Sequence, residues 1–499
     1  MKVNNPIFRV DMPDPDVIRV VDTYYMVSTT MFFMPGGAIL KSKDLVNWEP
    51  CSYIFETIEN NDIYELKNKK NAYGKGQWAT SLIFHNDMFY ACFVCHDLQK
   101  TFIYYTDDIE KTGWNRYVIN DVFHDMSFLF VDEIPYLIYG NGTIYAVELN
   151  KDLSGVKDGG FHDVILETPK EGMWLRCEGC RAYIRNGYIY LSFIDIPDDV
   201  VGNGQRRQIC YRSKTLTGPY ERKIILDDDF SLNKRGIAQG PFIVDEKNNG
   251  YAMLFQDRAS AGRMPFLMPL KWENDWPVLG DDSNVPELFE TCFDGYQSND
   301  TKFITSDTFN HDENKLDICW QWNHNPINNC WSFTDNPGHL RLTVGQLSDN
   351  LLEARNTLTQ RTMEPYSEFT VELDAKGLKN GDYAGLTAFM SQYGQIGLYK
   401  KDDVIFKKYV RRDKDYKLTE VVEKCGTDDV SLKIVFDFTD FKDIAMFYIR
   451  EDGNEWKQFG ETLHMEYTLD LFVGYRIGLF CYGEESLGGY ADFADFTFA

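Results

Sequence analysis

Five side chains in the first half of the chain stand just ahead of short segments that resemble one another: Asp14, Trp78, Asp125, Glu178 and Gln239. Three of the five are carboxylic acids. Carboxylates that lie close together resist joint ionisation, so one can hold a proton while another stays ionised, as paired general acid and base chemistry requires. Because repulsion between close carboxylates is unfavourable, three acids that converge on one place indicate a functional site.

The first of these acids lies between two prolines, in the sequence Pro13-Asp14-Pro15. Proline fixes its own φ and restricts the residue before it, so we expect Asp14 in an extended conformation on a stiff segment ahead of a strand. Such a segment would hold a carboxylate in place. By itself the motif is more typical of an ordinary turn, and only the rest of the chain favours a functional interpretation.

The segments that follow these side chains form a repeat. Each consists of an apolar strand, a short polar turn and an aromatic-rich strand, which is the pattern of a β-hairpin. The five segments are Val17–Ser28, Leu82–Val94, Phe128–Gly140, Ala182–Ile194 and Phe242–Phe255. They recur at intervals of roughly 45–65 residues without helical periodicity between them, which predicts a five-bladed β-propeller.

A second element recurs between the hairpins, at Ile39–Trp48, Ile103–Trp114 and Ile209–Tyr220, and we expect it to supply outer strands of the blades. A β-sandwich would explain short strands, but not two interleaved elements in constant order. In a propeller the innermost strands line the central axis. The side chains just ahead of them should therefore meet in one funnel.

The pattern changes near residue 280. We predict a propeller domain over 1–285, a linker over 286–298 and a β-sandwich over 299–499, with alternating strands at Phe369–Leu373, Gly385–Ser391, Val430–Phe436 and Ile444–Ile449. Trp320 and Trp322 alternate with a glutamine, so they share one face of a strand. Core packing is the favoured interpretation of this aromatic face, and a platform for sugars is the alternative.

The composition limits the partners and the compartment. A net charge of −26 over 499 residues disfavours nucleic acid and favours a neutral polar ligand. The N-terminal residues lack the apolar core of a signal peptide, and no run of about 18 apolar residues exists, so we expect no membrane span. Eleven cysteines without a secretion signal predict free thiols in the cytoplasm.

Two cysteine pairs have the spacing of zinc knuckles, Cys92 with Cys95 and Cys177 with Cys180. The first pair lies in an apolar run typical of a strand. Residues three apart on a strand point to opposite faces, which makes a poor chelate. Neither pair has the glycine and polar turn of a knuckle, so we do not predict zinc at these pairs.

With Pro13–Asp16, Asp125 ahead of a hairpin and Cys177–Gly179, the chain resembles glycoside hydrolase family 43. Further agreeing stretches are Ser42–Trp48, Gln239–Gly240, Phe255–Arg263, Trp320–Pro326 and Ala354–Thr362. The last two resemble the C-terminal sandwich of the β-xylosidase-like members, so the resemblance covers essentially the whole chain. It implies an all-β protein, a five-bladed β-propeller followed by a concanavalin A-like β-sandwich.

The resemblance also implies roles for the three acids. Asp14 corresponds to the general base and Glu178 to the general acid, while Asp125 corresponds to the residue that modulates the pKa of the acid and orients it. The family is similar to other inverting enzymes, whose two carboxyl groups stand roughly 6.5–9.5 Å apart with a water between them. Asp14 would deprotonate that water, and the charge of Asp125 would favour the neutral form of Glu178.

Further residues are candidates for substrate binding. Trp78 would stack on the sugar at the bottom of the pocket, and phenylalanines would close the rim. Arginines would bind ring hydroxyls, although packing and surface salt bridges are ordinary alternatives for these residue types. The candidates are Trp78, Phe33 with its neighbour Phe32, Gln239, Arg258 and Arg263.

The sequence departs from the family pattern at two places. Many relatives have proline where this chain has Cys180, and many have histidine where it has Ala238. In some members that histidine belongs to a water or metal cluster on the axis, so its replacement argues against bound calcium. We expect no metal ligands and no cofactor.

The substrate is the least determined feature. Xylopyranose and arabinofuranose present similar hydroxyls, and the family hydrolyses both. The sandwich domain favours an exo-1,4-β-xylosidase that acts on short xylo-oligosaccharides, with an α-L-arabinofuranosidase of arabinoxylan side chains as the alternative. The expected partner is a small oligosaccharide, and a homo-oligomer is compatible with the sequence.

Two other classes stay open. A non-catalytic sugar-binding propeller should have lost one acid, yet all three are present. A phosphorylase of mannosides also has five blades, but it should carry a basic phosphate pocket near the axis. The sequence indicates no such basic cluster near the acids.

Overall fold

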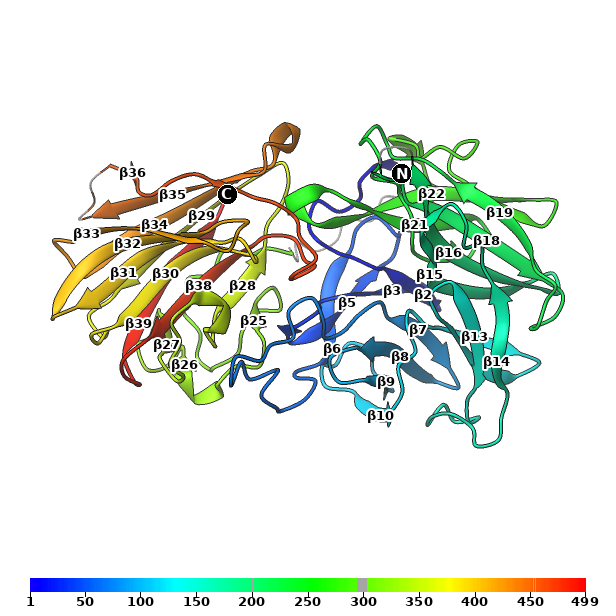
Figure 1. Cartoon of the computed structure of the whole chain (residues 1–499), viewed down its shortest axis with the longest axis horizontal. Helices are drawn as coiled ribbons and strands as arrows, with labels where there is room; N and C mark the ends of the chain where they lie inside the picture. The colour runs from blue at the N-terminus through cyan, green and yellow to red at the C-terminus, as the bar shows by residue number, and fades with distance from the viewer. Residues whose placement is uncertain (200–201, 294–302, 452, 454) are drawn as a thin grey trace.

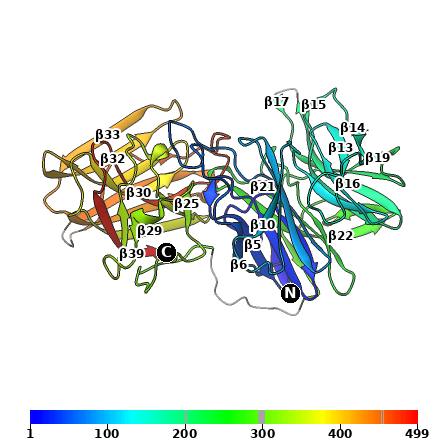
Figure 2. The same cartoon turned by 90° about the horizontal axis from the view of Figure 1, so that it is seen from below.

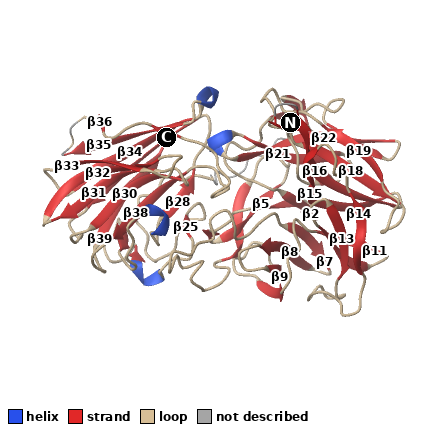
Figure 3. Cartoon of the chain, viewed as in Figure 1, coloured by secondary structure: helices blue, strands red, loops and turns tan. Residues whose placement is uncertain are grey.

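The computed structural model of the chain describes residues 1–199, 202–293, 303–451, 453 and 455–499. Two β-structured bodies lie side by side, a propeller that holds the N-terminus and a sandwich that holds the C-terminus (Figure 1). Almost all regular structure is strand (Figure 3). The helices of the described residues are short 3₁₀ turns: η1 Ala259–Ala261, η2 Asn328–Cys330, η3 Leu351–Glu353 and η4 Thr439–Phe441. None of the described helices has the length and hydropathy of a membrane span.

Five four-stranded antiparallel sheets form the blades of the propeller. In strand order they are β2 Asp16–Val20, β3 Thr23–Ser28, β5 Gly36–Ser42 and β6 Glu49–Phe55 (blade 1); β7 Ser81–His85, β8 Met88–Cys95, β9 Lys100–Thr106 and β10 Asn115–Ile119 (blade 2); β11 Ser127–Val131, β12 Ile134–Tyr139, β13 Thr143–Glu148 and β14 His162–Glu167 (blade 3); β15 Met173–Arg185, β16 Tyr188–Asp199, β18 Arg207–Ser213 and β19 Glu221–Leu226 (blade 4); and β20 Phe242–Val244, β21 Gly250–Asp257, β22 Arg263–Glu273 and β23 Trp276–Leu279 (blade 5). A short strand, β17 Gly202–Asn203, pairs with β16.

The predicted hairpins are confirmed as the first two strands of each blade, and the second recurring element supplies the third strands β5, β9 and β18. The hairpin turns have the chemistry that their sequences require. Asn186 and Gly187 both have positive φ, at 49° and 71°, as a two-residue turn between twisted strands demands. Apolar clusters fill the space between neighbouring blades, for example Ile138 and Leu191 between blades 3 and 4.

The two ends of the propeller sequence pair with each other as antiparallel strands. β1 Lys2–Asn4 pairs with β24 Leu288–Glu290, with Val3 opposite Phe289. The predicted linker over 286–298 therefore begins too early, because residues 288–290 form a strand of the propeller body. Residues 294–302, which include the end of that linker and its junction with the predicted sandwich, lie outside the described residues.

Two eight-stranded antiparallel sheets form the sandwich. The first has the order β33 Leu418–Lys424, β32 Val404–Arg412, β31 Gly394–Lys401, β30 Asp382–Phe389, β38 Arg476–Gly483, β28 Leu358–Arg361, β25 Gln321–Asn323 and β4 Phe33–Met34. The second has the order β26 Trp331–Ser332, β27 Leu340–Thr343, β39 Tyr490–Phe498, β29 Tyr366–Asp374, β34 Asp429–Asp437, β35 Ile444–Glu451 and β36 Lys457–Gln458, with β37 Leu463–His464 beside β35. All four strands predicted for this region are found.

The two domains are interlocked rather than merely adjacent. β4 comes from the propeller sequence but pairs with β25 at the edge of a sandwich sheet, with Met34 opposite Trp322. Seen from below, the two bodies again lie side by side, with the N-terminus on the propeller side (Figure 2). The predicted division at one sequence position is therefore incomplete. Trp320 and Trp322 are 1% and 3% exposed, so the core interpretation of that aromatic face is confirmed.

Candidate active site

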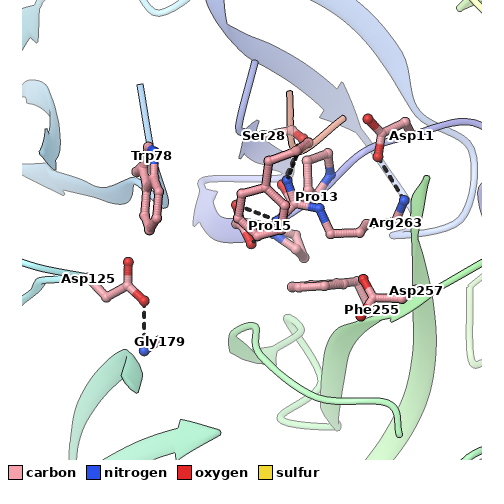
Figure 4. Close-up of polar contacts among 12 residues, drawn as sticks. Asp11, Pro13, Pro15, Ser28, Trp78, Asp125, Gly179, Phe255, Asp257 and Arg263 are labelled. Atoms are coloured by element: carbon pink, nitrogen blue, oxygen red, sulfur yellow. Dashed lines mark hydrogen bonds and ion pairs between the residues drawn. The ribbon is translucent and has the colours of Figure 1, made fainter. Parts of the chain in front are cut away.

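One cavity of about 820 Å³ lies where the five blades converge. All five side chains that precede the inner hairpins line it, one from each blade: Asp14, Trp78, Asp125, Glu178 and Gln239. The convergence that the repeat predicted is thus confirmed. Figure 4 shows Trp78 and Asp125 on one side of this space, with the Pro13–Pro15 segment and Arg263 facing them across it.

Asp14 is held from several directions. The residue is 6% exposed, and its carboxylate accepts hydrogen bonds from Nη1 of Arg263 at 3.1 and 3.3 Å. The backbone on its N-terminal side is fixed, because the carbonyl of Pro13 accepts bonds from the Ser28 hydroxyl and the Thr29 amide. Burial opposes the charge of Arg263, but the surrounding acidic groups, of which Asp14 contributes most, together outweigh burial and raise the pKa of that guanidinium. The pair is therefore a buried ion pair inside the pocket.

The conformation of Asp14 differs from the expectation. Its φ is 52°, in the left-handed region, and not extended as its position before proline suggested. Aspartate tolerates this region better than most residues. The Arg263 ion pair and the two bonds to the Pro13 carbonyl supply tertiary contacts that override the local preference.

Asp125 supports the backbone beside the predicted acid. It is 5% exposed, and its Oδ2 accepts the backbone N–H of Gly179 at 3.0 Å (Figure 4). Burial raises the pKa of Asp125 above its usual range, His124 opposes that change, and the charge of Glu178 adds to it. The segment that carries Glu178 is thus tied to the neighbouring blade.

Glu178 lies on β15 and is less buried than the two aspartates, with 22% of its side chain exposed. Two donors meet at one of its oxygens, Oε2. Nδ2 of Asn141 donates at 2.6 Å, and Nε2 of His124 donates at 3.1 Å. The same His124 nitrogen lies 3.7 Å from Oδ2 of Asp125. The second oxygen of Glu178 accepts neither of these bonds.

His124 and Asn141 were not predicted from the sequence. Burial opposes protonation of His124, but the charge of Asp125 and the hydrogen bond and charge of Glu178 raise the pKa of His124 to about 9. The position of His124 directly before Asp125 could have identified it, because Asp125 lines the same cavity. Asn141 lies in the turn between β12 and β13, and no local sequence pattern distinguishes it as a site residue.

The sandwich domain also reaches the pocket. Leu469 and Phe472, from the segment between β37 and β38, line the cavity. The guanidinium of Arg263 lies 4.3 Å from the centre of the Phe472 ring and donates to the Phe472 carbonyl at 3.2 Å. Trp78 packs on the same ring at 5.9 Å. Both domains therefore build one wall around the Asp14–Arg263 pair.

Three predicted binding residues lie elsewhere, since Phe32 is also fully buried and does not line the cavity. Phe33 is fully buried and packs against Phe389 and the guanidinium of Arg476, because its strand β4 belongs to the sandwich sheet. Arg258 does not line the cavity, since it forms an ion pair with Glu364 at 2.7 Å. The placement predicted for these three residues is wrong. Trp78, Gln239 and Arg263 do line the cavity.

Basic residues are present near the acids, contrary to the expectation. Arg206, Lys234 and Arg235 line the cavity together with Arg263. Arg206 pairs with Asp257 at 3.5 Å, and Lys234 with Asp199 at 2.6 Å. These charges are thus balanced by carboxylates, but the absence of a basic cluster is no longer an argument against phosphate.

The site does not fit an axial calcium ion held as in the relatives with histidine. Ala238, at that position, has no ligand atom in its side chain, and its backbone N–H and carbonyl both bond to Phe255, at 3.1 and 3.2 Å. Among the described residues, one group of three side chains has ligand atoms within 4.8 Å of one another: His124, Asp125 and Glu178.

Three carboxylic acids from three blades line one cavity together with Trp78, and glycoside hydrolysis uses an acid and a base on either side of a sugar. The sequence model described as "Glycosyl hydrolases family 43" matches residues 3–277. The model described as "Beta xylosidase C-terminal Concanavalin A-like domain" matches residues 306–499. The chain belongs to glycosyl hydrolase family 43.

Known relatives agree with this assignment. A protein named β-xylosidase from Formosa agariphila is 28% identical over 99% of this chain and 90% of its own length. A protein named non-reducing end α-L-arabinofuranosidase from Bacteroides ovatus is 27% identical over 68% of this chain and 64% of its own. A solved structure titled bifunctional GH43-CE, from Bacteroides eggerthii, has a TM-score of 0.92 and 38% identity. It covers 100% of this chain, which spans 63% of that protein.

Proposed function

We propose that this hydrolase releases terminal xylose from short xylo-oligosaccharides, as an inverting exo-1,4-β-xylosidase. The observation that carries the proposal is the composition of the pocket wall. A sandwich of the β-xylosidase C-terminal type supplies Phe472 and Leu469 to the cavity that holds the three acids. The name of the Formosa relative supports the same substrate. Removal of arabinofuranose is the alternative, which the name of the Bacteroides ovatus relative supports.

In this proposal Asp14 is the general base. It would take a proton from the water that attacks the anomeric carbon. The ion pair with Arg263 fixes the direction of the carboxylate, and the 6% exposure of Asp14 limits access of other waters. A base acting through water leaves no covalent intermediate, so the product has the opposite anomeric configuration.

Glu178 is the general acid. The donors Asn141 and His124 both bond to Oε2, so a proton on Glu178 belongs on the other oxygen, Oε1. That oxygen would deliver the proton to the oxygen of the leaving group. Asp125 positions the acid through the Gly179 N–H and raises the proton affinity of His124. The three groups therefore share their protons as one unit.

The leaving group would occupy the outer part of the cavity. Trp174 is 54% exposed and lines the cavity beside Leu175, four residues before Glu178 on the same strand. An exposed indole at a sugar pocket offers a stacking surface. Arg206 and Lys234 line the same cavity and provide hydrogen-bond donors.

The decisive experiment compares an aryl β-xyloside, an aryl α-arabinofuranoside and xylobiose under one set of conditions. The proposal predicts the highest kcat/KM on the two xylosides, and proton NMR of the first-formed sugar should show inverted configuration. A preference for the arabinofuranoside would select the alternative, and retention would assign Asp14 as a nucleophile. Formation of xylose phosphate in added phosphate would instead identify a phosphorylase.

A further inference from the structure

The side chains around the predicted acid have the spacing of ligands around a small transition-metal ion. Nε2 of His124 lies 3.1 Å from Oε2 of Glu178 and 3.7 Å from Oδ2 of Asp125, and the three atoms lie within 4.8 Å of one another. Tetrahedral zinc with bonds of about 2.0–2.1 Å separates its ligand atoms by about 3.3–3.4 Å. An ion between these atoms would therefore require only small side-chain shifts.

A second histidine, His96, fixes the orientation of the His124 ring. Nδ1 of His124 lies 3.1 Å from Nε2 of His96, whose ring packs edge-on against Trp78 at 4.7 Å. Because Nε2 of His124 faces Glu178 and Asp125, Nδ1 is the nitrogen that remains to bond with His96. Metal-binding histidines nearly always donate their second N–H to a fixed partner, usually a carboxylate, a backbone carbonyl or water, which fixes the tautomer and the ring orientation. His96 is that partner here.

We propose that His124, Asp125 and Glu178 form a binding site for Zn²⁺ or a similar divalent transition metal, which inhibits the enzyme. Two carboxylates balance the charge of the ion, and the net charge of −26 attracts cations to the surface. The fourth position would face the cavity that these residues line. Calcium is excluded from the proposal, because it takes 6–8 oxygen ligands at longer distances.

Inhibition follows from the ligand set. The metal takes the lone pair of His124 and the oxygen atoms of Glu178 and Asp125, so the protons shared by this unit pass to solvent and the acid cannot protonate a leaving group. Removal of the metal restores the unit. The inhibition rests on the proposed function, whereas the binding does not.

Binding is tested directly by calorimetric titration of untagged, chelator-treated protein with ZnCl₂ and, separately, CaCl₂. The background variant is Cys292→Ser, because this exposed thiol lies 3.0 Å from Asp245 and is a competing zinc ligand. The expected result is one zinc per chain and no calcium. His124→Asn should weaken zinc at least tenfold, and His96→Gln by roughly 10–100-fold through the lost orientation.

His162→Asn is the matched control, since His162 is exposed, on β14, and bonds only to Tyr139 among the described contacts. It should leave zinc affinity unchanged. Zinc should also abolish hydrolysis, and a chelator should restore it. Zinc affinity that survives both His124→Asn and His96→Gln, or absence of stoichiometric zinc, overturns the site. Stoichiometric zinc on a protein that hydrolyses no glycoside would refute the proposed function and leave the site intact.

Discussion

At the scale of single residues, three of the five pocket positions share a strained backbone. Asp14, Asp125 and Gln239 have φ values of 52°, 47° and 66°. The left-handed region costs roughly 1–2 kcal/mol for residues other than glycine. Polar contacts offset this cost at each position: Asp14 pairs with Arg263, Asp125 accepts the Gly179 N–H, and the Gln239 N–H donates to Gln208. Strain that recurs at equivalent positions around one pocket is typical of functional sites.

The roles of the acid and the base can be separated by the choice of leaving group. Glu178→Ala should reduce kcat on xylobiose by about 10²–10⁴-fold, which is the usual contribution of a general acid. The loss should be much smaller on an aryl xyloside, since a good leaving group needs little protonation. Asp14→Ala should lose activity on both substrates. Equal losses of Glu178→Ala on both would refute the acid assignment, with circular dichroism as the control for folding.

Asp125 should control the proton on His124. Its charge is one of the interactions that raise the pKa of His124 to about 9 against burial. Asp125→Asn removes a negative charge that stabilises the imidazolium, so the pKa of His124 should fall. NMR titration of protein with ¹³C-labelled histidine measures this change, and His162 should not respond.

Asp125→Asn should also move the basic limb of the pH–rate profile to lower pH, because the proton shared by His124 and Glu178 is then lost at a lower pH. A shifted His124 with an unchanged basic limb would leave Asp125 with a positioning role only.

At the scale of elements, the irregularity of β15 aims the acid. Its pairing with β16 shifts register on both sides of Glu178, which pairs with Ile194. Bulges of this kind redirect a side chain without ending the strand. Gly179, the next residue, has a φ of 70°, and a Cβ there would stand 2.9 Å from Cδ of Gln239. The bulged strand thus depends on glycine for both its conformation and its close approach to blade 5.

Gly179→Ala tests this element against a matched control. Gly187→Ala changes a glycine with a φ of 71° in the same strand pair, where a Cβ would meet only Lys214 Nζ at 3.9 Å. Both variants should lose about 1–2 kcal/mol of stability through the left-handed conformation. Only Gly179→Ala should also lose roughly 10²-fold in kcat, because the acid is displaced. Equal kcat in the two variants would show that the contact with Gln239 does not position Glu178.

At the scale of the whole molecule, the active site depends on the junction of the two domains. Asp11 accepts the N–H of Arg263 at 2.7 Å and the N–H of Gly474 at 2.9 Å, so one carboxylate ties blade 5 to the sandwich segment that carries Phe472. β4 crosses into the sandwich, and one apolar core runs through both bodies. Opening of the junction would therefore remove a wall of the pocket.

This junction should weaken in acid because of His324. The side chain is fully buried, stacks on Phe32 at 5.0 Å, and accepts the Ala72 N–H at Nε2. Burial lowers its pKa to about 3, and the charge of Arg355 adds to this effect. The unfolded chain binds the proton at about pH 6.5 and the folded chain does not, so stability is present above pH 6.5 and is lost as pH falls toward 3.

Between pH 7 and pH 5 the free energy of unfolding should fall by about 2 kcal/mol through this histidine. Urea denaturation at the two pH values measures the change. His324→Gln should be less stable at pH 7 and should lack this part of the pH dependence, whereas His339→Gln, at a half-buried position, should retain it. Identical pH dependence in His324→Gln would contradict the assignment.

The sequence by itself determined the blades and the acids. Alternating apolar residues and turn residues such as Asn186-Gly187 specify hairpins locally, because strand periodicity and turn conformation depend on neighbours in the chain. Once five such hairpins form a propeller, the residues ahead of them must converge. That is why Asp14, Asp125 and Glu178 could be placed in one cavity before the structure was known.

Only the tertiary structure decided which other residues join them. Phe33 lies outside the cavity because its strand pairs with the sandwich sheet, and Arg258 because it forms an ion pair with Glu364. Phe472 lines the cavity although it belongs to the sandwich domain. Asn141 and His124 reach Glu178 across a blade boundary. Contacts between segments so far apart in the sequence leave no periodic trace in it, because they depend on how complete sheets pack and not on local conformational preference.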